Sequence, residues 1–221
     1  FQNQSLYTRS SVATLEYFLH NRGNHAPVYR LQINCRNTPR IAQHAELFSR
    51  SRPGYTRCLR ADNHLEPEFV YYSDDVQQEA LLYEVLGRLY DAGFRGQDIV
   101  VLSTRADSFA LVSKCRGQPW RDRLRPIASA SEHHIPFTTI HSFKGLESPA
   151  VVISDVDIVD SERLQELLYV GLTRALECVV VLVHTRTRSA LLECLKSTAT
   201  LQRWGGFACQ HPIIWQAAST C

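Results

Sequence analysis

The sequence contains no methionine, and its seven cysteines include no Cys-x-x-Cys pair. An odd number of cysteines without regular spacing argues against a disulfide framework or a structural zinc site, and it favours a reducing compartment. No apolar run reaches the length of about 18 residues that suggests a membrane span, and the first residues lack the pattern of a signal peptide. We therefore expect a cytoplasmic protein without a membrane partner. The lack of methionine in a chain that begins at Phe1 also suggests a fragment of a longer polypeptide.

The chain also lacks an excess of charge of one sign. Its 24 Lys and Arg residues against 22 Asp and Glu leave a formal net charge of +2. This balance excludes the global basic signature of many nucleic-acid-binding proteins, so any such site must be a local patch. With 44% hydrophobic and 21% charged residues among 221, the composition is that of an ordered globular protein with a full core.

Apolar segments typical of strands alternate with helical patterns. Residues 98–102 form a continuous apolar run of the kind that is buried on both faces of a parallel sheet. The expected strands are residues 28–33, 69–72, 98–102, 150–154 and 179–183; the expected helices are residues 11–20, one from Pro39 with Asn37 or Thr38 as its cap, 74–92 closed by Gly93, one carrying 167–175, and 189–195. This alternation predicts an α/β domain with crossover connections.

Two segments, residues 49–63 and 105–125, are rich in basic residues. The second also contains Trp120, and arginines beside an aromatic ring can hold a single nucleic-acid strand through phosphate contacts and base stacking. A solvated surface connection is the simpler interpretation of both segments, and we favour it.

The most informative segment, residues 137–147, reads Phe-Thr-Thr-Ile-His-Ser-Phe-Lys-Gly-Leu-Glu and connects two expected strands. The carboxyl end of a parallel strand, followed by the start of a helix, offers backbone amides and a favourable field for anions. Side-chain donors here are Thr139, His141, Ser142 and Lys144. The segment therefore predicts a phosphate-binding surface.

Further along the chain, residues 169–175 read Tyr-Val-Gly-Leu-Thr-Arg-Ala. The earlier segment contains Thr-x-His-x-x-Lys-Gly-Leu-Glu, beginning at Thr139. In their order along the chain, the two segments resemble motifs V and VI of the UvrD/Rep-like superfamily 1 helicases. Asn34-Cys35-Arg36-Asn37 resembles motif IV, with Cys35 in place of the usual aromatic residue, and Gln4-Ser5-Leu6-Tyr7 resembles the end of motif III. The short interval between motifs IV and V is similar to that of the compact members.

The resemblance spans residues 4–175 and implies the second, C-terminal RecA-like domain of such a helicase. This domain is α/β, a RecA-like parallel sheet flanked by helices, similar to P-loop NTPases but without the P-loop. The chain then divides into a linker and helix at 1–24, the RecA-like domain at 25–198 and a tail of unknown role at 199–221.

No Gly-x-x-x-x-Gly-Lys-[Ser/Thr] occurs in the sequence, so the loop that cradles the phosphates of ATP is absent. Asp155-Val156-Asp157 follows an apolar run, but it lies beside motif V and does not make a convincing Walker B pair. We expect the chain alone not to hydrolyse ATP, and an N-terminal RecA-like domain of the same polypeptide to bind most of the ATP and Mg²⁺.

The resemblance implies roles at the nucleotide for five residues. Arg36 and Arg174 match arginine fingers, which stabilise the charge of a transferring phosphoryl group and are worth about 10³ to 10⁵ in rate. Glu147 matches the ribose contact, Gln4 matches the residue that senses the terminal phosphate, and Gly145 belongs to the same cofactor-binding set.

A simpler role for Arg174 is to cap its helix or to pair with a carboxylate such as Glu177. Gly171, one turn earlier, favours a close approach between elements instead, because glycine costs about 1 kcal/mol inside a helix.

On the nucleic-acid side, the resemblance assigns single-stranded DNA contacts to Tyr7, Thr139, His141 and Lys144. The sequence as a whole predicts the C-terminal motor domain of an ATP-dependent DNA helicase or translocase. The alternatives are a non-catalytic RecA-like module that binds nucleic acid or a protein, and a platform for single strands.

Overall fold

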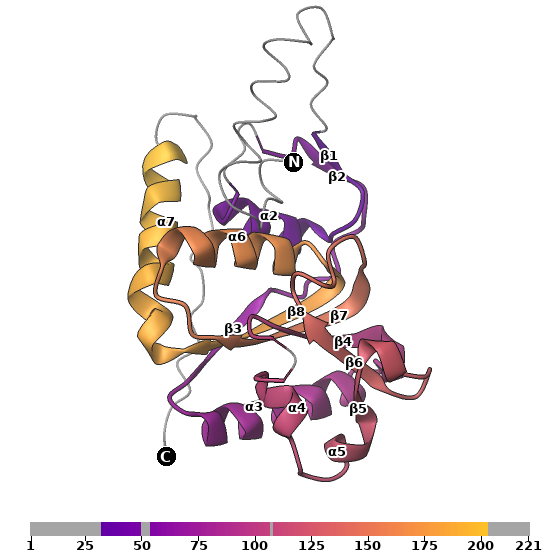
Figure 1. The fold of residues 1–221 in the computed structure, drawn as a ribbon. Coiled ribbons are helices and arrows are strands. Elements are labelled where there is room, and N and C mark those ends of the chain that lie inside the picture. The colour runs from indigo at the N-terminus through magenta and orange to yellow at the C-terminus, as the bar shows by residue number, and fades with distance from the viewer. Residues whose placement is uncertain (1–31, 50–53, 107, 203–221) are drawn as a thin grey trace, which may run out of the picture.

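The computed structural model describes residues 32–49, 54–106 and 108–202 (Figure 1). The expected contacts of Gln4 and Tyr7, the helix expected at 11–20 and nearly all of the tail therefore lie outside the described residues. Within these ranges, no helix is both long enough and apolar enough to cross a membrane.

Six strands form one parallel sheet, in the order β3-β8-β7-β4-β6-β5. The strands are β3 (Glu68–Tyr72), β4 (Ile99–Ser103), β5 (Leu124–Pro126), β6 (Ile135–Thr139), β7 (Ser148–Val156) and β8 (Ala175–His184). Every residue of β4 is buried, as expected for a parallel strand covered on both faces. A separate parallel pair joins β1 (Ile33–Asn34) to β2 (Arg57–Cys58).

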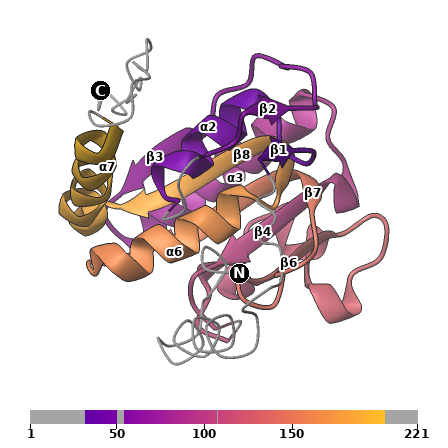
Figure 2. The same ribbon diagram turned by 90° about the horizontal axis from the view of Figure 1, so that it is seen from above.

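Helices cover both faces of the sheet (Figures 1 and 2). One face carries α2 (Pro39–Leu47), α6 (Ser161–Leu172) and α7 (Arg188–Gln202). The other carries α3 (Asp75–Asp91), α4 (Leu111–Lys114) and α5 (Trp120–Arg123). Among the described residues, the short 3-10 helices η2 (Gly96–Asp98), η3 (Ile127–Ser129) and η4 (Thr185–Thr187) complete the connections.

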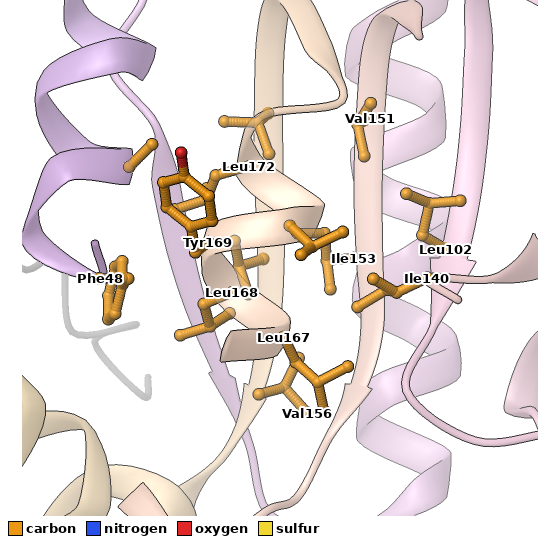
Figure 3. Close-up of a cluster of buried hydrophobic side chains, with 14 of the residues drawn as sticks. Phe48, Leu102, Ile140, Val151, Ile153, Val156, Leu167, Leu168, Tyr169 and Leu172 are labelled. Carbon is orange, nitrogen blue, oxygen red and sulfur yellow. The ribbon is translucent and has the colours of Figure 1, made fainter. Parts of the chain in front are cut away.

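The core on the α6 face is formed by side chains from helices and strands far apart in sequence (Figure 3). Leu168 and Tyr169 of α6 pack with Phe48, which follows α2, and with Ile153 of β7. Gly171 permits this packing, because a Cβ at this position would lie 2.6 Å from Ile153 Cδ1. The close approach predicted from the glycine is therefore confirmed.

Local signals fixed the ends of two helices as predicted. Thr38 is the N-cap of α2, with Pro39 at the first helical position. Asp74 begins α3 by accepting a hydrogen bond from the Gln77 backbone N–H at 2.8 Å. Gly93 follows this helix with φ +101°, a conformation that favours glycine.

Other predictions need correction. The segment 105–125 is not simply a loop, since it holds α4, α5 and the start of β5. Trp120 is buried and packs edge-on against Tyr90, with ring centroids 5.4 Å apart, so it cannot stack on a nucleic-acid base. The expected strand at 28–33 is described only from residue 32, where β1 begins at Ile33, and α7 continues beyond the predicted 189–195 to Gln202.

Candidate functional site

Three segments meet at the amino ends of β7 and β8. Ser148 at the start of β7 pairs in register with Ala175 at the start of β8. The end of the 137–147 loop therefore lies beside the start of β8. The loop before α2 reaches the same place, because Asn37 Nδ2 donates to Ala175 O at 2.6 Å. Arg36, Glu147 and Arg174, predicted from motifs IV, V and VI, are thereby brought to one edge of the sheet.

The backbone around Arg36 is fixed by two buried asparagines. Asn34 Oδ1 accepts from the backbone N–H groups of Arg36 and Asn37, each at 2.9 Å, and Asn34 Nδ2 donates to Asn37 Oδ1 at 3.0 Å. Sequence reasoning assigned Asn37 only to a helix cap and gave Asn34 no role. Their spacing was the available signal, because asparagine often bonds the backbone two or three residues ahead.

Arg36 and Glu147 form an ion pair, with Arg36 Nε 2.7 Å from Glu147 Oε2. Their side chains are 36% and 48% exposed, respectively. A pair this exposed contributes about 0 to 1 kcal/mol, so a ligand that offers better partners can separate it at little cost. The residue predicted to contact phosphate and the one predicted to contact ribose thus hold each other in this conformation.

Arg174 is almost fully buried, at 1% exposure. Its guanidinium donates to Val170 O at 3.2 Å, to Leu146 O at 3.4 Å and to Thr173 Oγ1 at 3.1 Å. Burial, followed by the positive charge of Arg36, lowers its pKa from the ordinary value. Of the simpler roles, the helix cap is therefore observed.

The expected alternative partner of Arg174, Glu177, lies elsewhere. Its Oε1 is 3.8 Å from Arg60 Nη1. No ion pair joins Arg174 to a carboxylate within the described part of the chain. Tyr55 lies beside Tyr169 of α6, with its hydroxyl 3.5 Å from that of Tyr169, and burial raises the pKa of Tyr55.

Thr139, a predicted DNA contact, lies at the opposite end of the 137–147 loop. Thr139 ends β6 and pairs in register with Ser103 at the carboxyl end of β4. Thr139 Oγ1 accepts from the Ser142 backbone N–H and donates to Ser142 Oγ, both at 3.0 Å. The loop therefore crosses from the carboxyl edge of the sheet, at Thr139, to the amino edge, at Glu147.

The expected helix start after β6 is absent, because residues 140–145 form turns. The Phe143 N–H donates to Thr139 O at 3.1 Å and the Lys144 N–H to His141 O at 3.2 Å. These amides satisfy the turn, so they are not available to a phosphate. Gly145 supplies the positive φ of +96° that returns the chain toward Glu147.

A local group of cationic side chains nevertheless gathers here. Burial, followed by the charges of Arg163 and Lys144, lowers the pKa of His141. Lys144 and Arg163 are exposed, and Arg163 belongs to α6. We call His141, Lys144 and Arg163 the basic patch. Sequence reasoning missed Arg163, because only the packing of α6 beside the loop brings it near His141.

The parallel sheet with helices on both faces defines an α/β domain of the RecA-like class. A solved structure, the C-terminal domain of a possible DNA helicase from Lactobacillus plantarum WCFS1, is similar, with a TM-score of 0.52 at 15% sequence identity over 74% of this chain and 96% of that chain. At this identity the likeness concerns the fold alone, and it confirms the predicted fold class.

Residues 134–182 match the family model for the UvrD-like helicase C-terminal domain. This range holds the 137–147 loop, α6 and most of β8, and therefore the segments that resemble motifs V and VI, but not those that resemble motifs III and IV. The resemblance to the C-terminal domain of UvrD-like helicases is confirmed. No curated protein matches the chain significantly.

Proposed function

We propose that the chain is the C-terminal motor domain of an ATP-dependent DNA helicase or translocase. The observation that carries the proposal is the convergence of Arg36, Glu147 and Arg174, from three separate segments, at the amino ends of β7 and β8. Arginine fingers act by contributing a permanently charged fork to a nucleotide held by a neighbouring domain. This edge would then form one wall of the ATP cleft.

Arg36 is suited to bind the phosphates of a nucleotide, and Glu147 is suited to bind its ribose. A partly exposed guanidinium can donate to phosphate oxygens, and a partly exposed carboxylate can accept from ribose hydroxyls. Since the sequence has no Walker A loop, the phosphates and Mg²⁺ would be held mainly by an N-terminal RecA-like domain. ATP supplies the hydrolysis energy, and the role of this chain is to complete the cleft.

Arg174 would serve as the second finger. The guanidinium is buried under the segment that contains Leu146, so this role requires that segment to move when the cleft closes. Of the three bonds that hold Arg174, the one to Leu146 O is the bond that movement of this segment would break.

Single-stranded DNA would lie along the basic patch. Exposed Lys144 and Arg163 can neutralise phosphates, and Thr139 would help to orient the backbone from the end of β6. Because the loop connects this patch directly to Glu147, a shift of the strand can be transmitted to the nucleotide edge through one short segment.

The test is single-strand-stimulated ATP hydrolysis by the full-length parent protein, with the 221-residue chain as the control. We expect stimulated turnover by the parent and none by the chain. A parent that binds single strands but shows no turnover would contradict the motor proposal.

A non-catalytic RecA-like module is the second candidate function. It is favoured by the burial of Arg174 and by the pairing of Arg36 with Glu147, which leave the predicted catalytic groups satisfied within the domain. The same experiment separates the two functions, because only the motor requires turnover.

A further inference from the structure

A pocket lies among residues of α4, α5, β5 and β6. Figure 1 shows these elements at the outer strand of the sheet. The volume of the pocket is about 440 Å³. Three arginines and several buried apolar side chains line it: Arg116, Arg121 and Arg125, with Val112, Leu124 and Phe137. We call it the arginine pocket.

The lining carries three arginines against a single carboxylate, and Glu79 beside the pocket accepts from the Arg116 backbone N–H at 3.3 Å rather than from its guanidinium. None of the three forms an ion pair with another residue that the structure describes. Arg116 Nη1 donates to Cys115 O at 3.1 Å, and Arg125 Nη1 donates to Leu124 O at 2.9 Å. These bonds to the backbone hold both guanidinium groups at the pocket while leaving further N–H groups to meet a ligand.

One carboxylate, that of Asp122, also lines the pocket. Its Oδ2 accepts from Gln118 Nε2 at 3.0 Å, so it is directed toward a neutral partner. The lining therefore keeps an excess of positive charge, which favours an anionic ligand.

The apolar residues of the lining favour a ligand that has an apolar group as well as negative charge. A nucleobase packed on Val112, Leu124 and Phe137 would bury polar edge groups against apolar side chains, which is costly where those groups find no partner. A bulky apolar side chain has no such groups. Arginine binds carboxylates with two parallel hydrogen bonds, so the rim suits Asp or Glu residues.

We propose that the arginine pocket binds a segment of a partner protein in which a bulky apolar residue lies between acidic residues. The apolar side chain fills the pocket, and the carboxylates bind Arg116, Arg121 and Arg125. The chain's own tail does not have the complementary charge, because residues 199–221 contain no Asp or Glu.

The experiment measures fluorescence anisotropy of a labelled peptide, Asp-Glu-Phe-Asp-Glu, mixed with the 221-residue chain. We expect saturable binding. The peptides Asp-Glu-Ala-Asp-Glu and Asn-Gln-Phe-Asn-Gln should each bind at least about tenfold more weakly, since one lacks the apolar anchor and the other the charges.

The protein variants locate the site. The double substitution Arg116→Ser/Arg121→Ser should weaken binding at least about tenfold, because it removes two rim charges. The control Arg57→Ser/Arg88→Ser removes the same charge from exposed positions outside the pocket and should bind like the unsubstituted chain. All four arginines are exposed, so both proteins are expected to fold.

Failure of the peptide to bind, or equal binding by the Arg116→Ser/Arg121→Ser variant, would overturn the proposal. A labelled oligodeoxythymidylate is tested in parallel. The proposal is wrong if the oligodeoxythymidylate binds while the peptide does not, and if the Arg116→Ser/Arg121→Ser substitution abolishes binding of the oligodeoxythymidylate. The pocket would then be a nucleic-acid site. Neither result depends on whether the parent protein hydrolyses ATP.

Discussion

The two edges of the sheet use charged residues in opposite ways. At the amino ends of the strands, Arg36 and Glu147 form an ion pair that remains partly exposed. At the carboxyl end of β7, Asp155 is fully buried and accepts hydrogen bonds from Ser103 Oγ at 2.6 Å and from Gln78 Nε2 at 3.3 Å. The first arrangement can exchange partners with a ligand, whereas the second is closed.

Asp155 also shows why an acidic residue at a strand end does not by itself identify a site. Its φ is +59°, an uncommon value for a residue other than glycine, and its carboxylate also lies 3.3 Å from the Leu111 backbone N–H. Arg105 lies 3.8 Å from it and pairs more closely with Asp157, at 2.6 Å. We assign this network to stability.

Removing the buried Asp155 carboxylate at the carboxyl end of β7 should have the largest effect on stability. Asp155→Ala leaves the buried donors of Ser103 and Gln78 without an acceptor, and it places alanine at a positive φ. We expect the free energy of unfolding to fall by about 3 kcal/mol or more. Urea unfolding of the 221-residue chain provides the measurement.

Asp155→Asn and Asp91→Ala are the controls for this substitution. Asparagine keeps an acceptor and tolerates positive φ, so it should cost only about 1 to 2 kcal/mol. Asp91 is exposed at the end of α3, and its replacement should change stability by less than about 0.5 kcal/mol. Equal effects of Asp155→Ala and Asp91→Ala would contradict the structural role of the network.

Substitutions at two glycines test the packing of α6 against β7. Gly171→Ala places a Cβ 2.6 Å from Ile153 Cδ1, so we expect a loss of about 1 to 3 kcal/mol from overpacking. Gly87→Ala on α3 meets nothing within 4 Å and should instead stabilise the chain by about 0.5 to 1 kcal/mol. Thermal unfolding compares the two, and a stabilising Gly171→Ala would show that α6 does not need its close contact with β7.

The basic patch should give a smaller, pH-dependent effect. Since burial and the nearby charges of Arg163 and Lys144 lower the pKa of His141, the folded chain holds this proton less tightly than the unfolded chain. The resulting stability is present above about pH 6.5 and is lost as the pH falls through the lowered pKa. His141→Gln should remove this dependence, which urea unfolding at pH values on both sides of about 6.5 would measure.

The pKa of His141 also provides a test for DNA binding at the basic patch. A phosphate beside His141 favours the charged ring, so an oligodeoxythymidylate should raise the pKa of His141 in an NMR titration. Binding of the strand without any change in this pKa would move the DNA contact away from the basic patch.

The sequence predicted the parts of the molecule that depend on local patterns. The buried strand at 98–102, the Asp74 cap and the close contact at Gly171 follow from periodicity, capping and the cost of glycine in a helix, and all three are observed. Motif order predicted the family resemblance, but not that Arg36, Glu147 and Arg174 lie at the amino ends of β7 and β8.

Features that depend on tertiary packing were not predictable in this way. The burial of Arg174, the burial of Trp120 and the proximity of Arg163 to His141 each require knowing which helix lies beside which loop. The turn after β6 was missed for a different reason, since a polar segment after a strand is equally typical of a helix start and of a tight turn.

The central claim is that the amino edge of the sheet contributes an arginine finger to ATP hydrolysis. The most direct measurement is single-strand-stimulated turnover by the full-length parent protein carrying Arg174→Lys, with Arg60→Lys, at a partly exposed arginine that pairs with Glu177, as the control. Lysine keeps the charge but loses the planar fork, so we predict turnover reduced by about 10³ with single-strand binding unchanged, and no effect of Arg60→Lys. Unchanged turnover in a folded Arg174→Lys protein would contradict the account.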